Sequence, residues 1–378
     1  MTLPPLSLYV HIPWCVRKCP YCDFNSHEAA RIPETEYVAA LLQDLDLDLA
    51  FVQGRQLHSI FFGGGTPSLF HASSIGAILN AAERRIGFAN DVEITLETNP
   101  GTAEYDNLAG YKSAGVNRIS FGVQSFNDAH LHALGRIHSS GEVLRAYDQA
   151  RRAGFGNINL DLMHGLPQQT PVQAQADLRQ ALALSPEHIS WYQLTIEPNT
   201  VFHSRPPQLP ADEVLWDIQE AGQAILEQGG FTQYEISAYS IPGRRARHNL
   251  NYWEFGDYLA IGAGAHGKIT WADGTIQRYW KTRKPADYLA PDKAFTAGQN
   301  AVAREQQVLE FMMNALRLVD GVPQAWFAER TQLPESVLAN PKSELIARGL
   351  MVDSPVQLQA TSLGLRFLND TLAAFDGL

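Results

Sequence analysis

The three cysteines of this chain, Cys15, Cys19 and Cys22, fall close together, and no other cysteine occurs in its 378 residues. Thiolates at Cys-x3-Cys-x2-Cys spacing are typical of a metal site rather than of a disulfide framework. Such a set can hold three irons of a [4Fe-4S] cube and leave the fourth iron open to a small molecule. An open iron beside a reducible cluster is a reaction site.

The cysteine group also fits two alternatives, which stay open at this point. A structural zinc needs four closed protein ligands, so His11 or His27 would have to complete a Cys3His set. Reduced cysteines can also pack as small apolar side chains, although such cysteines usually scatter through a core.

Composition narrows the class of protein. With 29 Lys and Arg against 40 Asp and Glu, the formal net charge is -11, which argues against general attraction to nucleic acid or anionic lipid. No apolar run approaches the ~20 residues that span a bilayer, and residues 1–6 lack the basic start of a signal peptide. We therefore expect a cytoplasmic protein, because thiols stay reduced there.

Six short runs rich in β-branched or aromatic residues alternate with helical periodicity in the first half of the chain. The predicted strands are 6–11, 59–62, 92–97, 118–123, 157–163 and 189–194. Predicted helices include 34–51 and 73–87. Six βα units in series predict an α/β fold, a parallel sheet curled into a partial barrel with its ligand site at the carboxyl ends of the strands.

Beyond residue 210 the pattern loosens. We expect a helix at 211–228 and irregular strands and loops over 231–280 that cover the barrel. Helices at 305–318, 322–330 and 342–348, a strand pair within 350–359 and a last helix at 361–375 resemble a winged-helix unit. Its six Lys and Arg against nine Asp and Glu favour packing or partner docking over nucleic-acid binding.

Polar residues stand where the predicted strands end. The Gly63-Gly64-Gly65-Thr66-Pro67 stretch lets the backbone approach a ligand and expose N–H groups to a carboxylate, although a tight turn would account for it as well. Each of the other acidic and amide residues could singly be a satisfied core polar group or a helix cap, and the arginine could simply be exposed. Together they indicate a shared polar ligand with amine, ribose and carboxylate groups. These other residues are Glu97, Gln124, Asp161 and Arg136.

Residues 9–22, with 63–67, Glu97, 121–126 and Asp161, closely resemble the radical S-adenosylmethionine superfamily. The branch is the one that contains oxygen-independent coproporphyrinogen III dehydrogenase, and the resemblance covers most of the chain. It implies a partial (β/α)6 TIM-like barrel with a mostly helical C-terminal domain. It also implies a [4Fe-4S] cluster on the three cysteines, with S-adenosyl-L-methionine on the open iron.

The same resemblance implies residue roles by position. Contacts to S-adenosylmethionine fall on Tyr9, Tyr21, Gly64 and Glu97. Positions that seat a second copy in the dehydrogenase match Gly65, Thr66, Gln124, Arg136, Asp161 and Thr195.

Other features resemble the HemW-type haem chaperones instead. Cys15 lies almost at the start of the chain, and Phe24 stands where the dehydrogenase has an additional cysteine. Residues 244–253 contain a His-Asn-x-x-Tyr-Trp string similar to the signature of that group. Haem needs an axial ligand, flat walls and cations for two propionates, and this segment offers all three. From the residues alone a surface loop is the simpler interpretation; the resemblance makes His248 the candidate ligand of the haem iron.

We therefore expect three segments: the barrel at 1–235, a covering segment with the haem motif at 236–300, and the C-terminal domain at 301–378. The expected function is a haem chaperone, without established turnover, that delivers haem to acceptors such as respiratory cytochromes, some of them membrane-bound. The resemblance is compatible with a homodimer, and no nucleic-acid partner is expected. The alternative is the dehydrogenase, a radical oxidoreductase acting on coproporphyrinogen III propionates.

Overall fold

In the computed structural model, which describes residues 2–101 and 108–377, six parallel strands form the first half of the protein. They are neighbours in chain order, and all six predicted strands are confirmed, with ends that shift by a few residues. Their bounds are β1 (Leu6–Ile12), β4 (Leu57–Gly64), β5 (Phe88–Thr98), β6 (Arg118–Gln124), β7 (Ile158–His164) and β8 (His188–Gln193).

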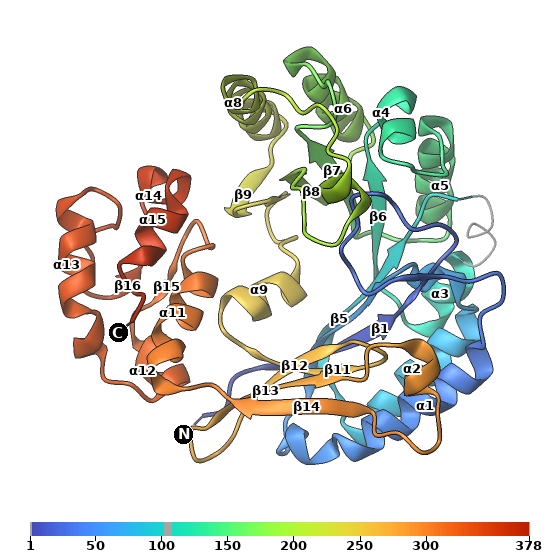
Figure 1. The fold of residues 1–378 in the computed structure, drawn as a ribbon, viewed down its shortest axis with the longest axis horizontal. Helices are drawn as coiled ribbons and strands as arrows, with labels where there is room; N and C mark the ends of the chain where they lie inside the picture. The colour runs from blue at the N-terminus through green and yellow to red at the C-terminus, as the bar shows by residue number, and fades with distance from the viewer. Residues whose placement is uncertain (1, 102–107, 378) are drawn as a thin grey trace.

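Helices cover the outer, convex side of this curved sheet (Figure 1). Local sequence fixes where they start: at the beginning of α6, Thr170 and Gln173 form a capping box and Pro171 occupies the first turn. The helices of this part are α1 (Glu34–Leu47), α2 (Ala72–Arg85), α3 (Leu108–Ala114), α4 (Asp128–Ala133), α5 (Ser140–Arg152), α6 (Pro171–Ala183), α7 (Val201–Ser204) and α8 (Asp212–Gln228). The predicted helices at 34–51, 73–87 and 211–228 are confirmed, the first ending in a separate 3-10 turn at Leu49–Val52.

The expectation of irregular strands and loops over 231–280 is wrong, because this stretch extends the barrel sheet at both edges. β11 (Asp257–Ile261) pairs in parallel with β1, and β12 (His266–Thr270), β13 (Ile276–Lys281) and β14 (Thr296–Ala301) follow antiparallel. At the other edge β10 (Ala238–Ser240) and β9 (Thr232–Glu235) pair antiparallel beyond β8. The result is a single sheet of twelve strands within the described residues.

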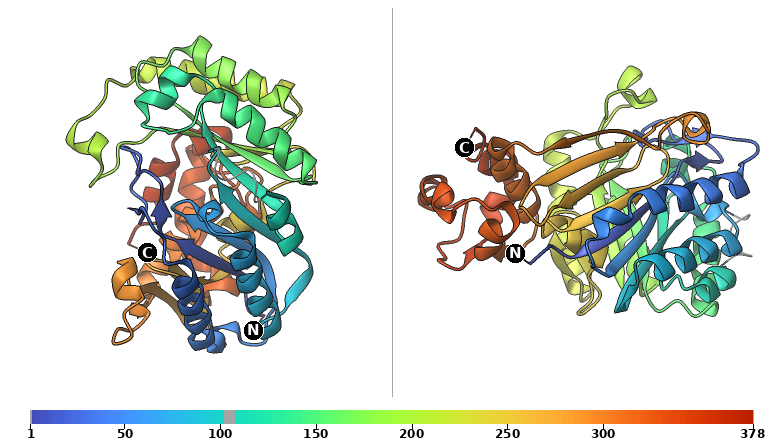
Figure 2. Two further views of the ribbon diagram at one scale, coloured as in Figure 1. Left: turned by 90° about the vertical axis from the view of Figure 1, so that its right-hand side faces the viewer. Right: turned by 90° about the horizontal axis from the view of Figure 1, so that it is seen from below.

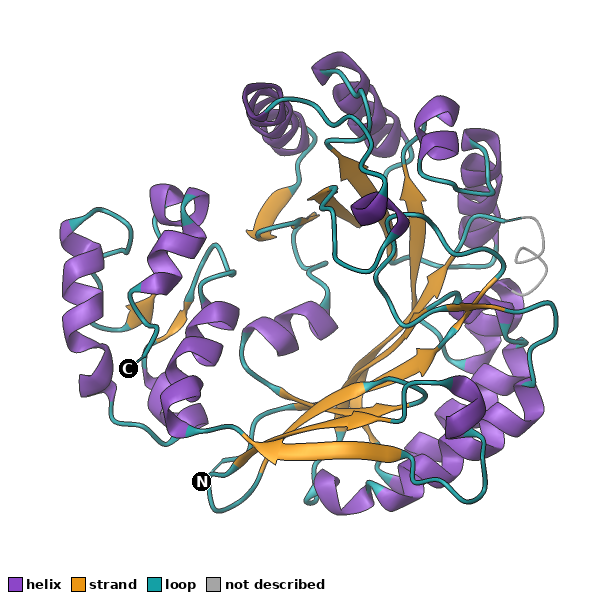
Figure 3. Ribbon diagram, in the orientation of Figure 1, coloured by secondary structure: helices purple, strands orange, loops and turns teal. Residues whose placement is uncertain are grey.

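The segment with the haem motif is also more ordered than predicted. Residues Arg247–Trp253 form a helix, α9, rather than a loop. This helix lies on the inner, concave side of the sheet, apart from the outer layer of helices (Figures 1 and 3).

The C-terminal unit packs as a small helical group around a second hydrophobic core, distinct from the core under the barrel sheet. Tyr234, Ala238, Phe255 and Ile276, which precede the unit in the chain, also belong to this second core. Two details differ from the sequence prediction. Val322–Pro323 is a short strand, β15, paired with β16 (Gln357–Leu358), and the last predicted helix is interrupted at Phe367. The helices are α11 (Arg304–Ala315), α12 (Ala325–Thr331), α13 (Ala339–Ala347), α14 (Ser362–Arg366) and α15 (Leu368–Ala373).

This unit lies on the open side of the curved sheet, where it follows β14 and Leu318 bridges to Glu235 of β9, and away from α2 and α3 (Figures 1 and 2). The three predicted segment boundaries stay a prediction. No helix within residues 2–101 and 108–377 has the length and apolar character to cross a bilayer.

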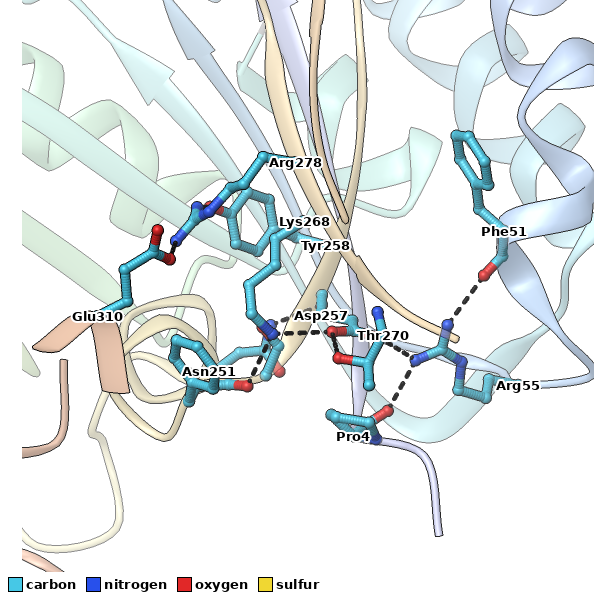
Figure 4. A network of polar contacts seen from close by, with 12 residues as sticks. Pro4, Phe51, Arg55, Asn251, Asp257, Tyr258, Lys268, Thr270, Arg278 and Glu310 are labelled. Atoms are coloured by element: carbon cyan, nitrogen blue, oxygen red, sulfur yellow. Dashed lines mark hydrogen bonds and ion pairs between the residues drawn. The ribbon is translucent and has the colours of Figure 1, made fainter. Parts of the chain in front are cut away.

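A buried charge network ties the N-terminal segment to the added strands (Figure 4). Asp257 at the start of β11 accepts hydrogen bonds from Arg55 at 2.7 Å, from Lys268 at 3.0 Å and from both the backbone and the hydroxyl of Thr270 at 2.8 Å. Arg55 also donates to the Pro4 carbonyl. These partners hold the pKa of Asp257 below its usual value despite burial.

We expect Asp257→Ala to lower the free energy of unfolding by about 3–5 kcal/mol, because it leaves the Lys268 ammonium buried without its counter-ion. Denaturant titration followed by circular dichroism measures this loss. The matched control is Asp292→Ala, an exposed aspartate, which should change stability by no more than about 0.5 kcal/mol. Equal effects of the two substitutions would contradict a structural role for the network.

Candidate functional site

The cysteine loop leaves β1 and is held in place at both ends. Trp14–Cys15 (β2) pairs with His27–Glu28 (β3), and within the loop the Cys22 amide donates to the Cys19 carbonyl at 3.1 Å. All three cysteines are free thiols of intermediate exposure. Burial raises the pKa of Cys15 and Cys22, the Thr66 side chain acting in the opposite direction on Cys15.

The glycine-rich end of β4 fixes this loop by close backbone contact. The Gly65 amide donates to the Ile12 carbonyl and the Thr66 amide to the Trp14 carbonyl, both at 2.7 Å. A Cβ on Gly65 would stand 2.4 Å from the Trp14 carbonyl oxygen. The expectation that these amides are exposed to a ligand carboxylate is therefore wrong: they anchor the cysteine loop, while the Gly64 amide donates to Glu97 at 3.2 Å.

We expect Gly65→Ala to cost about 1–3 kcal/mol of stability, because the added methyl group cannot enter without moving the Trp14 backbone. Chemical denaturation measures the cost. Gly156→Ala is the matched control, since nothing lies within 4 Å of its added Cβ. If both variants were as stable as the original chain, the close contact would have no structural importance.

At the carboxyl ends of the strands lies a cavity of about 450 Å³, which we call the first cavity. Its volume is in the range of small-molecule sites, roughly 300–1,000 Å³. The structure brings nearly all the predicted site residues to its wall, including the three cysteines. The other predicted residues that line it are Tyr21, Gly64, Gly65, Thr66, Glu97, Gln124, Arg136, Asp161 and Thr195.

Arg136 connects the cysteine loop to the strand ends. Its Nη2 donates to the Gly122 carbonyl at 2.8 Å, and its Nη1 lies 3.6 Å from the Cys19 sulfur. The Nε atom is buried without a hydrogen-bond partner within the described residues. A guanidinium in this position offsets the negative charge of a thiolate, and desolvation raises the pKa of the half-buried Tyr21 beside it.

Glu97 and Asp161 place two carboxyl groups on the cavity wall. Burial and the nearby Asp161 raise the pKa of Glu97 to about 8, partly offset by the Gly64 amide. Asp161 accepts hydrogen bonds from Ser120 at 2.7 Å and from Asn159 at 2.8 Å. Two acids in one cavity suit a ligand that carries an amine or another cationic group.

The raised pKa of Glu97 predicts a pH dependence of stability. Its neutral form is favoured in the folded state, so its contribution is complete below the ordinary value near 4.5 and is lost as pH rises through about 8. We expect the free energy of unfolding to fall across this range. Glu97→Gln should remove this fall in the free energy of unfolding, which denaturation measured from acidic to mildly alkaline pH would follow. An unchanged pH dependence in the variant would contradict a raised pKa for Glu97.

Gln124 is held in a left-handed conformation, with φ of 67°, where β6 ends. Its Oε1 accepts a hydrogen bond from the Tyr192 hydroxyl at 3.1 Å. A non-glycine residue in this region is uncommon and often marks a functional site. Tyr192 was missed in the sequence because nothing distinguishes it there from an ordinary strand residue.

A second cavity, of about 760 Å³, adjoins the first on the inner side of the sheet. The two share Asp23, Phe24, Gly64 and Glu97 in their walls. Tyr9, predicted with the first ligand, lines the second cavity instead, with its hydroxyl 2.8 Å from Nδ1 of His11. Its predicted role as a contact to S-adenosylmethionine stays a prediction.

His248 lies on the wall of the second cavity, in the first turn of α9. Its Nδ1 is 3.2 Å from Oε1 of Glu93, an oxygen that also accepts from the Arg247 and His248 amides. The ring packs on Phe61 at 4.2 Å between centroids. Burial lowers the pKa of His248, so the imidazole is neutral, and the Nδ1 contact leaves Nε2 as the nitrogen available to a ligand.

The cations of the same segment do not face the cavity, contrary to the expectation that 244–253 supplies every haem-binding group. Arg245 pairs with Asp320 and Arg247 with Asp91, each at 2.6 Å. Trp253 packs with Arg317 at the second core, 4.3 Å from the guanidinium to the ring centroid. Only His248, Asn249 and Tyr252 of the segment line the cavity.

A hydrogen-bonded chain links the two cavities through the inside of the barrel. From Asp161 it passes through Asn159 and His188, with 2.6 Å between Asn159 Oδ1 and His188 Nδ1. His188 Nε2 then contacts the Tyr234 hydroxyl at 2.8 Å, which accepts from Asn249 at 3.0 Å. Helix α9 is thereby fixed relative to the strands that line the first cavity.

The donor set fits an iron–sulfur cluster better than a zinc ion. Of the two histidines that a zinc site could use, His11 has both ring nitrogens bonded, to Tyr9 and to the Asn25 carbonyl, and His27 contacts the Asn25 side chain through Nε2. Among the described residues no three His, Cys, Asp or Glu side chains converge as one metal ion requires. In a cube each thiolate binds a different iron, so such convergence is not needed.

Comparison with known proteins agrees with this fold and site. A model of the radical SAM superfamily matches residues 9–181, and one of the HemN C-terminal domain matches 302–367. The structure described as "Coproporphyrinogen III oxidase (HemN) from Escherichia coli is a Radical SAM enzyme" aligns with a TM-score of 0.83 and 23% identity, covering 99% of this chain and 90% of that one. The fold is therefore that of a radical SAM protein.

Full-length relatives narrow the class. The heme chaperone HemW of Haemophilus influenzae is 52% identical over 378 residues, covering 99% of this chain and 98% of the relative. The heme chaperone HemW of Escherichia coli is 50% identical, covering 99% of this chain and 98% of the relative. The heme chaperone HemW of Bacillus subtilis is 35% identical, covering 98% of this chain and 99% of the relative. The chain belongs to the HemW family of heme chaperones.

Proposed function

We propose that this protein carries haem and transfers it to acceptor haem proteins while holding a [4Fe-4S] cluster and S-adenosylmethionine. The observation that carries the proposal is the pair of adjoining cavities, one lined by three free cysteines and the other by a neutral histidine on α9. The names and identities of the full-length relatives support the same function.

Cys15, Cys19 and Cys22 would hold the cluster. When bound, it supplies a redox centre and an open coordination position for amino and carboxylate groups. Arg136 offsets the thiolate charge on one side of the loop, and the Gly65 and Thr66 amides keep the loop against β4.

The first cavity would take S-adenosylmethionine. Its cationic amine and sulfonium suit a wall that contains Glu97 and Asp161. The wall that contains the three cysteines also contains Tyr21, Gly64, Thr66, Gln124 and Thr195. Tyr9 would complete the set predicted for the S-adenosylmethionine on the cluster. Gly65 and Arg136 belong to the positions that match those of a second copy.

Haem would bind in the second cavity against His248. A neutral imidazole whose Nδ1 is held by a carboxylate is the usual form of a metal-binding histidine, because the carboxylate fixes the tautomer and the ring. Glu93 supplies that carboxylate, and the same oxygen accepts hydrogen bonds in the first turn of α9.

We further propose that the protein is cytoplasmic and forms a homodimer. Its acceptors would be respiratory haem proteins, some of them membrane-bound.

A second candidate function is the radical oxidative decarboxylation of coproporphyrinogen III. The shared fold with the HemN structure favours it, since that alignment covers almost the whole chain. Phe24, exposed at the border of both cavities, favours the carrier, because it replaces the additional cysteine of the dehydrogenase.

One anaerobic experiment separates the two functions. Reconstituted protein is loaded with haemin and mixed with an apo-cytochrome, and haem transfer is followed by absorbance. The same preparation is supplied with S-adenosylmethionine, a reductant and coproporphyrinogen III. We expect haem transfer without sustained decarboxylation, and a lower iron and sulfide content with impaired transfer for Cys19→Ser.

His248→Ala should weaken haem binding by about tenfold or more, since the outer partners of a metal ligand alone are worth 10–100-fold. His132→Ala, an exposed histidine on α4, is the matched control. Sustained decarboxylation would refute the carrier in favour of the dehydrogenase. A full cluster in Cys19→Ser would refute the cluster assignment.

A further inference from the structure

The second cavity contains three histidines, and their contacts divide them. His11, His248 and His266 all line it. His11 is fully engaged, with Nδ1 at 2.8 Å from the Tyr9 hydroxyl and Nε2 at 2.9 Å from the Asn25 carbonyl. It therefore positions the cysteine loop and has no nitrogen left for a ligand.

His248 keeps one ring nitrogen available, as described above, and His266 keeps both. His266 is the first residue of β12 and is exposed, and neither ring nitrogen has a hydrogen-bond partner within residues 2–101 and 108–377. Partial burial and the nearby Arg278 and Arg283 lower its pKa, so the ring is neutral. Two available imidazoles thus stand on the walls of one cavity, from α9 and from the added strands.

The two basic residues of this cavity, Lys281 and Arg283, also differ in whether they already have a carboxylate partner. Lys281 is fully buried and already forms two ion pairs, with Nζ at 2.6 Å from Asp44 and 2.8 Å from Asp48. Arg283 makes one weak contact, Nε to the Asn25 side chain at 3.4 Å, and no carboxylate of the described chain pairs with it. An arginine without a counter-ion at a cavity is suited to a carboxylate ligand.

Aromatic rings complete the wall near His266. Trp280 stands directly opposite His266 in the β12–β13 pairing, so the two side chains share one face of the sheet. Tyr252 of α9 packs against Tyr258 of β11 at 4.6 Å between centroids. A broad aromatic surface beside available imidazoles and one unpaired guanidinium suits a flat, metal-bearing dianion or polyanion.

We propose that the second cavity binds an iron tetrapyrrole with His266 as a second axial ligand, alongside His248, and with Arg283 pairing one propionate. The proposal rests on the proposed haem-binding function. It adds His266 and Arg283, two haem-binding groups that lie outside the His-Asn-x-x-Tyr-Trp segment. Arg245 and Arg247 of residues 244–253 pair with Asp320 and Asp91, and no arginine of that segment lines the cavity, so a propionate there needs another cation.

The test uses the full chain titrated with haemin. Absorbance and electron paramagnetic resonance should show low-spin, six-coordinate iron in the original chain. His266→Ala should retain haem and shift it to a high-spin form, and added imidazole should restore the low-spin spectrum. Arg283→Gln should weaken binding roughly tenfold without changing the spin state, as expected for one charge-assisted hydrogen bond.

His266→Met and His132→Ala complete the design. Exchange of an imidazole for a thioether raises the potential of the haem iron, so the Met variant should have a higher midpoint potential with haem still six-coordinate. His132→Ala should match the original chain in every readout. His266 is exposed and unpartnered, and circular dichroism should show that all variants fold.

The outcomes separate this proposal from the proposed function. Haem bound with an unchanged spectrum in both His266 variants would overturn the axial role of His266 and leave the carrier intact. An original chain that binds no haem would overturn both. A loss of low-spin character in His266→Ala, reversed by imidazole, would support the second ligand.

Discussion

The contact between the end of β4 and the cysteine loop is the constraint on which the site depends. Because Gly65 has no side chain, its amide and that of Thr66 reach the carbonyls of Ile12 and Trp14 at 2.7 Å, and the loop is held over the strand ends. Any side chain there would separate the two backbones. The position of the three thiols over the first cavity, and their distance from the second, follow from this approach.

Buried charges hold the part of the sheet that closes the second cavity. Asp257 at the start of β11 forms ion pairs with Lys268 of β12 and with Arg55 inside the fold. A pair of this kind adds little net stability compared with apolar packing, but it is costly to break. It fixes the register of β12, and hence where His266 stands relative to α9.

The two cavities are adjacent but differ in chemistry, which is a reasonable basis for a carrier. The first is lined by thiols, carboxyl groups and Arg136, whereas the second is lined by aromatic rings and imidazoles. Glu97, Gly64 and Phe24 belong to both, and a hydrogen-bonded chain runs from Asp161 to Asn249. The walls of the two cavities are thus connected by shared residues and by hydrogen bonds.

The sequence by itself determined the cysteine group, the six βα units and the polar strand ends, because each is a local pattern with a fixed period or spacing. It did not determine that the glycine amides bind the loop, that residues 247–253 form a helix on the inner face, or that 257–281 continue the sheet. Those outcomes depend on contacts between segments far apart in the chain, such as Gly65 with Trp14 and Asp257 with Arg55. His266 and Arg283 carry no signal in the sequence, because only the pairing of β12 with β13 brings them to the cavity that contains His248.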